Sequence, residues 1–139
     1  MDKTNLSFNR KKEISASVIE NGYKCEVLFV DEFHNFVLEV VTDQTLKIIK
    51  SKLELNKGPY EICNGMYNLV EKVRDFRVEK GYNKRISEIV GGKEGCTHLI
   101  DLFAEIGRGL IQIRLKHLLE SEMYEEWHNM LKNSCMSHK

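Results

Sequence analysis

A cysteine and a histidine stand two positions apart in the glycine-rich segment Gly-Gly-Lys-Glu-Gly-Cys-Thr-His-Leu, residues 91–99. Cys96 supplies a thiol and His98 an imidazole, the donors that zinc, iron and copper prefer. In an extended segment, side chains two residues apart share one face, so this pair can bind one ion if the loop is extended there. Glycines before Cys96 permit the backbone conformations that such a loop needs.

Two more residues complete a candidate metal set. Cys63 lies at the start of an apolar pattern of helical spacing, and His34 precedes a valine-rich strand. If the helices begin at one end of the sheet, these side chains converge with Cys96 and His98. Two thiols and two imidazoles suit zinc in a closed structural site, or an iron–sulfur cluster in an open one. We therefore predict zinc or an iron–sulfur cluster as the cofactor.

Other interpretations of the same residues stay open. In one, Cys96 packs beneath the helix and His98 hydrogen-bonds a backbone carbonyl, so that both are structural. In another, Cys96 is a nucleophile, because a helix N-terminus and a nearby imidazole lower the pKa of a thiol. In a third, the backbone N–H groups of the glycine loop hold an anion. The alternatives to metal binding are a protein-interaction module and a thiol-dependent transferase.

The first half of the chain predicts strands. Residues 14–18 alternate apolar and polar side chains, the pattern of a half-buried strand, and Asn21-Gly22 then predicts a tight hairpin turn. Three more strands are predicted over residues 23–30, 36–41 and 46–55, with turns at 31–35 and 42–44 and with lysines of the last strand facing solvent. Consecutive strands joined by short loops pair with their neighbours. The expected sheet is an antiparallel four-stranded meander.

The second half changes to helical spacing. Helices are predicted over residues 62–73, 83–90, 99–119 and 120–132. Thr97 is the expected N-cap of the long third helix, and Asp101 suits its first turn. Gly107 and Gly109 mark places of close packing or a bend, and Trp127 anchors the last helix. Strands followed by helices indicate an α+β fold, with three or four helices packed on one face of the sheet.

Composition limits the function classes. The chain has 139 residues, 42% of them apolar, with 21 basic and 21 acidic residues. This length fits one domain over residues 13–132, after a flexible lead-in (1–12) and before a disordered tail (133–139). A neutral balance speaks against nucleic acid as a partner, and no apolar run predicts a membrane span. Widely spaced cysteines and the lack of an apolar leader indicate a cytoplasmic protein.

The chain resembles a bacterial family of unknown function whose hallmark is a Gly-Cys-Thr-His-Leu signature, here residues 95–99. Supporting features are His34 before a valine-rich strand, and Pro59-Tyr60 followed, after two intervening residues, by Cys63. The resemblance covers about residues 10–112 and implies no established activity. In the order of its elements the chain also resembles NifU-like iron–sulfur scaffold proteins, with Cys63 and Cys96 at two of the cluster-binding positions.

These observations lead to one expectation about function. We expect a small cytoplasmic protein that binds a metal ion or an iron–sulfur cluster, or that serves a metalloenzyme as an accessory. The sequence identifies no reaction. Its partner is expected to be another protein or a second copy of the chain, because the apolar stripe of the long helix continues through Leu115, Leu118 and Leu119. Burial of that stripe by the last helix is the other explanation.

Overall fold

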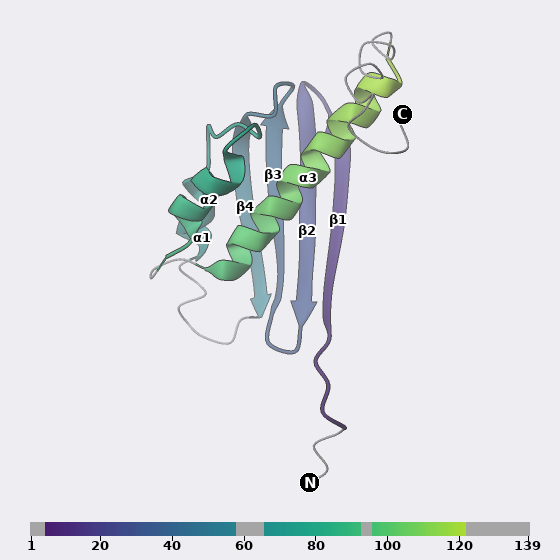
Figure 1. Ribbon diagram of the computed structural model, residues 1–139. Helices are drawn as coiled ribbons and strands as arrows, with labels where there is room; N and C mark the ends of the chain where they lie inside the picture. The colour runs from purple at the N-terminus through teal and green to yellow at the C-terminus, as the bar shows by residue number, and fades with distance from the viewer. Residues whose placement is uncertain (1–4, 58–65, 93–95, 122–139) are drawn as a thin grey trace.

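Four antiparallel strands form the sheet, and helices cover one of its faces (Figure 1). The computed structural model describes residues 5–57, 66–92 and 96–121. The strands are β1 (Arg10–Ile19), β2 (Gly22–Asp31), β3 (Asn35–Asp43) and β4 (Ile48–Lys57), and they lie side by side in chain order. The helices are α1 (Met66–Glu71), α2 (Tyr82–Val90) and α3 (Thr97–Leu119). The predicted α+β meander is confirmed.

The hairpin between β1 and β2 sets the register of these two strands. Ile19 pairs with Gly22, so the turn residues are Glu20 and Asn21, one position earlier than the predicted Asn21-Gly22 turn. Asn21 adopts a positive φ of 63°, which asparagine tolerates better than most residues. Gly22 is required for another reason, because a Cβ there would lie 1.9 Å from the carbonyl oxygen of Thr42 on β3. The same pairing runs down the hairpin to Arg10 and Asp31.

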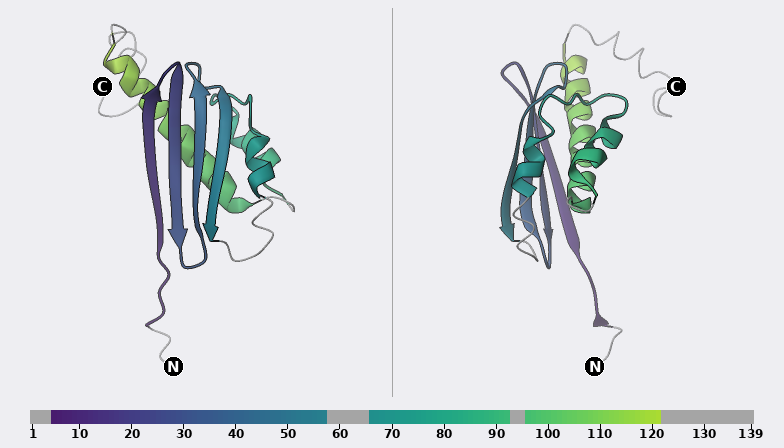
Figure 2. Two further views of the ribbon diagram at one scale, coloured as in Figure 1. Left: turned by 180° about the vertical axis from the view of Figure 1, so that it is seen from behind. Right: turned by 90° about the vertical axis from the view of Figure 1, so that its left-hand side faces the viewer.

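One face of the sheet carries the core. Alternate residues of β2 and β3 are buried there, as the period-2 pattern predicts. Figure 2 shows α2 and α3 on that side and α1 beside the β4 edge, with the opposite face bare of the helices that the structure describes. Lys50 and Lys52 of β4 are exposed, as predicted. The largest fully buried side chains are Phe29, Phe36, Phe103, Leu38, Ile48, Ile86, Leu99, Leu102, Ile106 and Leu110.

Helix α3 crosses the sheet diagonally, from the side of β4 to beyond β1 (Figure 1). The apolar stripe of α3 is the predicted one, and the helix ends at Leu119. The N-cap prediction is wrong: Cys96 is the N-cap, with extended backbone and no side-chain cap hydrogen bond, and Thr97 is the first helical residue. Asp101 lies past the first turn and pairs with Lys12 of β1, with Nζ and Oδ2 2.8 Å apart.

Glycines let α3 approach its neighbours closely. A Cβ on Gly109 would lie 2.8 Å from the sulfur of Cys25 on β2, and one on Gly107 would lie 2.7 Å from the ring of Tyr82 on α2. Both positions are therefore sites of close packing, one of the two roles predicted for them. None of the described helices is long and apolar enough to cross a membrane. The predicted helix over residues 120–132 and the tail from residue 133 lie outside the described residues, apart from Glu120 and Ser121.

Candidate functional site

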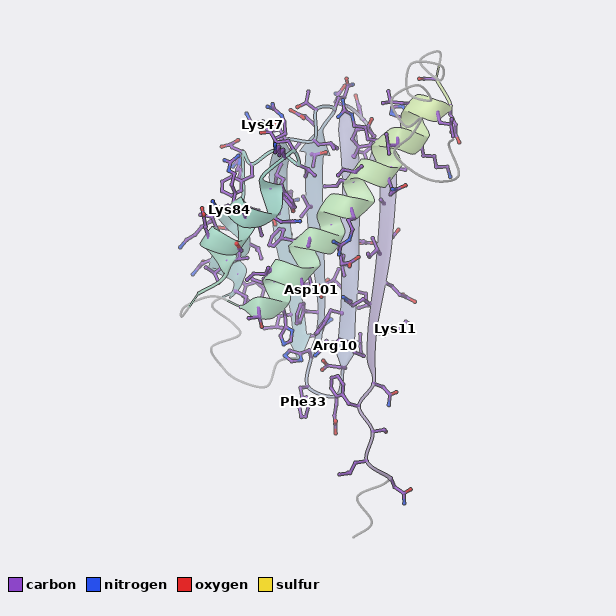
Figure 3. The ribbon with its side chains drawn as sticks, in the orientation of Figure 1. Arg10, Lys11, Phe33, Lys47, Lys84 and Asp101 are labelled. Atoms are coloured by element: carbon purple, nitrogen blue, oxygen red, sulfur yellow. The ribbon has the colours of Figure 1, made fainter. Side chains whose placement is uncertain are left out.

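The site lies where β2 turns into β3, beside the N-terminal end of α3. Asp31 ends β2, and its side chain folds back over the three-residue connection that follows. One carboxylate oxygen, Oδ1, accepts hydrogen bonds from the backbone N–H groups of Phe33 and His34, both at 2.8 Å. Asp31 therefore fixes the turn that presents His34. Arg10, Phe33 and Asp101 lie toward this same end of the sheet (Figure 3).

The Asp31 carboxylate has further partners on both sides. Its Oδ1 lies 2.9 Å from Nδ1 of His34, and its Oδ2 accepts from Nε and Nη2 of Arg10 at 3.0 and 2.9 Å. The Asp31 side chain is fully buried. Burial by itself raises the pKa of this carboxyl, but the hydrogen bonds from His34, Phe33 and Arg10 outweigh it and hold the pKa well below its ordinary value. Asp31 is therefore ionised at neutral pH.

An ionised Asp31 decides how His34 is protonated. A carboxylate only accepts hydrogen bonds, so Nδ1 of His34 must carry the proton that lies between them. In the neutral ring, Nε2 then keeps its lone pair. The His34 side chain is 11% exposed, so it is held in place by its surroundings and still reaches the surface. This is the arrangement of a metal-ligating histidine oriented by a carboxylate.

His98 lies against His34, although 63 other residues separate them in the sequence. Their ring centroids are 4.5 Å apart, with the planes at 68° to each other. Burial lowers the pKa of His98, and so do the nearby charges of His34 and Arg10, while Asp31 and Asp101 oppose the shift. Since the pKa falls below its ordinary value, His98 is a neutral imidazole at pH 7. It can then donate an electron pair to a metal ion.

Phe29 of β2 forms the wall behind both histidines. Its ring centroid lies 5.5 Å from that of His34 and 5.2 Å from that of His98, and Phe36 stacks on it at 5.0 Å. The guanidinium of Arg10 lies 4.8 Å from the same centroid. Phe29 is 1% exposed, so this wall is part of the core. Both imidazoles are thus held against a rigid apolar surface.

Among the described residues, Cys96 of the predicted set does not join this pair. Cys96 is half-buried and packs against the core. Its own backbone is extended, but His98 already belongs to α3, so the extended arrangement that would aim both side chains to one side is not formed. Cys63 lies outside the described residues. Within residues 5–57, 66–92 and 96–121, no three His, Cys, Asp or Glu side chains are grouped to hold a metal ion.

Three residues of the site were missed at the sequence level. Asp31 fell in the turn predicted at 31–35, Arg10 in the predicted lead-in and Phe29 in the strand predicted over 23–30, and none of them was given a role in the site. Counting outward from the observed Glu20-Asn21 turn pairs Arg10 with Asp31, which places a cation beside a carboxylate three residues before His34. The predicted Asn21-Gly22 turn would have paired Arg10 with Phe33, so this ion pair depends on the exact position of the turn.

Comparison with known proteins identifies the family of this chain. The family model described as protein of unknown function DUF2889 matches residues 14–112, most of the chain. No curated protein and no solved structure matches, so the resemblance to NifU-like scaffolds gains no support from these comparisons. The matched residues include Asp31, His34 and His98, whereas Arg10 lies just before them. The chain belongs to the DUF2889 family.

Proposed function

We propose that this protein binds a transition metal ion, with His34 and His98 as two of its ligands. The supporting observation is that two imidazoles from distant parts of the sequence lie with ring centroids 4.5 Å apart. A zinc ion is held about 2.0–2.1 Å from each histidine nitrogen. Centroids this close place both rings near enough to share one ion. Neutral His98 and the free Nε2 of His34 are the protonation states that binding requires.

The environment of the pair also suits a ligand role. The Asp31 carboxylate holds Nδ1 of His34, which leaves Nε2 as the nitrogen that can bind a metal ion. Asp31 itself is not a suitable ligand. Its two oxygens already accept five hydrogen bonds, from His34, Phe33 and Arg10.

The donor types favour a single ion over an iron–sulfur cluster. Clusters are held mainly by thiolates, whereas the two residues that the fold brings together offer imidazole nitrogens. Cys25 is fully buried in β2, and burial, with the charge of Glu26, raises the pKa of its thiol to about 12. Cys25 is therefore a protonated core residue. Cys63, which lies outside the described residues, stays a sequence prediction for a further ligand, whereas Cys96 packs against the core and is not grouped with the histidines.

The test is the metal content of the purified protein. Anaerobically purified wild-type protein should carry a first-row metal in a fixed ratio to the chain, without the visible absorption of a cluster. His98→Gln should lose that metal while keeping its circular dichroism spectrum. His117→Gln is the matched control, because His117 also lies on α3 and pairs with Tyr23, away from the site. Equal metal content in all three proteins would refute the ligand role of His98, and wild-type protein without metal would refute the proposal and favour the interaction-module alternative.

A further inference from the structure

The two edges of the sheet differ in how they are protected. Near the end of β4, the backbone N–H of Leu55 donates to the hydroxyl oxygen of Tyr67 at 3.2 Å. Near its start, the N–H of Ile48 donates to the carbonyl oxygen of Phe76 at 2.7 Å. The pairing of β3 with β4 is also irregular at two places. Such features keep an edge strand from pairing with another chain, so the β4 edge is blocked.

The outer edge of β1 has no such protection from the residues that the structure describes. Its pairing with β2 is regular over all ten residues, the strand contains no proline, and no described strand lies on its other side. Ile19 and Gly22 close the two-residue turn as a hydrogen-bonded pair, and such pairs recur at every second residue from there. The backbone N–H and C=O groups of the even-numbered residues of β1 therefore point away from β2.

The same even-numbered residues present an apolar row on the helix face of the sheet. Ile14 faces α3, where a Cβ on Gly109 would lie 3.2 Å from it, and Ala16 and Val18 follow on that face. Ile14 is nevertheless 42% exposed and Val18 45% exposed. Figure 1 shows the reason, because α3 crosses β1 close to its hairpin end. A strand added beside β1 would therefore extend the apolar layer on this face.

We propose that β1 pairs antiparallel with β1 of a second copy of this chain, in the register centred on Ala16. In this register Ile14 faces Val18 of the second copy, and Ala16 faces Ala16. Each of these pairs can exchange both backbone hydrogen bonds, because the groups point outward on both strands. The exposed apolar side chains of each copy then cover those of the other, and the two sheets join into one.

Charge supports a second copy as the occupant and selects the register. Lys12 faces Glu20 of the second copy, a cation opposite a carboxylate, and the two-fold axis repeats this pair. The ammonium group of Lys12 has three donors, so it can serve this carboxylate beside its pair with Asp101. Moving the second strand by two residues sets Lys12 against Val18 in one direction, or Ile14 against Glu20 in the other. The β1 strand is thus complementary to itself in the register centred on Ala16.

Sedimentation equilibrium of the full-length protein tests the proposal, with EDTA present so that no metal ion links two copies. The wild type should have the mass of two chains and dissociate to one on dilution. Val18→Glu should raise the dissociation constant at least about tenfold, because the interface would bury a charge twice. Ile49→Glu is the matched control, since Ile49 is 46% exposed on β4, at the other edge of the sheet. It should leave the dissociation constant unchanged.

Glu20→Lys tests the register. It places two cations opposite each other, and the two-fold axis repeats the loss, so the dissociation constant should rise about 3–30-fold. An unchanged constant would overturn the register centred on Ala16.

The other outcomes overturn the pairing itself. A wild type that stays monomeric at every concentration would mean that β1 is a free edge. A dimer that survives Val18→Glu, or that Ile49→Glu weakens equally, would use another surface. If Val18→Glu fails to fold by circular dichroism, Ala16→Pro replaces it. The N–H of Ala16 points away from β2, so proline there removes a donor to the second copy and none to β2.

Discussion

Asp31 holds Nδ1 of His34 at 2.9 Å through an oxygen that also accepts the two backbone N–H groups of the β2–β3 turn. One fully buried carboxylate thus fixes both the path of the chain and the direction of the imidazole. Its other oxygen ties the same turn to Arg10 on β1. The turn, the histidine and the edge strand form one unit, and His98 of α3 lies against it.

Asp31→Asn tests the carboxylate's role in this unit. The amide has nearly the same shape but lacks the charge that orients His34 and satisfies Arg10. We expect the affinity for Zn²⁺ to fall about 10–100-fold, the range for residues that orient a metal ligand. We also expect a loss of about 1–3 kcal/mol in unfolding free energy, because buried donors lose their partner. Calorimetric titration and urea unfolding measure the two effects. An unchanged Zn²⁺ affinity would show that Asp31 serves the fold alone.

Phe29→Leu tests the apolar wall behind the histidines. The smaller side chain leaves space beside both imidazoles, so we expect weaker Zn²⁺ binding together with a stability loss of about 1–3 kcal/mol. Ile48→Val is the control, because Ile48 is equally buried but has no ring contact with the pair. Its stability should fall by about 0.5–1.5 kcal/mol with the Zn²⁺ affinity unchanged. Equal effects of the two variants on the affinity would contradict a specific role for Phe29.

Gly109→Ala tests the close approach of α3 to the sheet. Alanine favours a helix by about 1 kcal/mol over glycine. Here, however, the new methyl group would lie 2.8 Å from Sγ of Cys25 and 3.2 Å from Ile14. We expect overpacking to win, with a net loss of about 1–2 kcal/mol in urea unfolding. In a Cys25→Ala background the loss should shrink, because the sulfur is gone. A stabilised Gly109→Ala variant would mean that α3 shifts freely on the sheet.

Asp43 links stability to pH at the turn between β3 and β4. Its Oδ1 accepts from the backbone N–H groups of Thr45 and Lys47 and from the Thr45 hydroxyl, at 2.8, 3.0 and 2.7 Å. Burial alone raises the pKa of this carboxyl, but these bonds and the charge of Arg77 lower it below its ordinary value. The stabilisation is therefore complete above the pKa of the unfolded chain and is lost as pH falls toward the lower pKa of the folded state.

Asp43→Asn should accordingly be less stable than the wild type at neutral pH, and the difference should shrink as the pH is lowered below about 4. Urea unfolding across this range measures it. Asp75→Asn is the control, an exposed position where the change should stay within about 0.5 kcal/mol. A difference between wild type and Asp43→Asn that stays constant with pH would contradict the role given to the charge.

Much of the fold follows from local sequence patterns. Alternation along β2 and β3 and the stripe of α3 are strong because each element buries one face, and each was predicted close to its observed bounds. Caps and ends were less predictable. Thr97 has a typical N-cap side chain, yet the helix starts one residue earlier in the chain because Cys96 takes the extended conformation. Only the packing of α3 on the sheet determines whether Cys96 or Thr97 is the N-cap.

The two histidines of the candidate site were predictable from the sequence, and the residues that hold them in place were less so. His34 and His98 were both predicted as ligands, and the fold brings them together. Pairing Cys96 with His98 depended on an extended segment, which the first turn of α3 replaces. Arg10 and Phe29 take part through strand register and packing. Such contacts join residues far apart in the sequence, so the contacts cannot be predicted from the residue types alone.

Zn²⁺ titration of four proteins tests whether His34 and His98 bind the same metal ion. Wild type and His117→Gln should bind one ion per chain with equal affinity. His34→Gln and His98→Gln should each weaken that binding by far more than Asp31→Asn does, with folding intact by circular dichroism. If both of these variants bind Zn²⁺ as tightly as the wild type, the histidine pair is a packing contact and not a metal site.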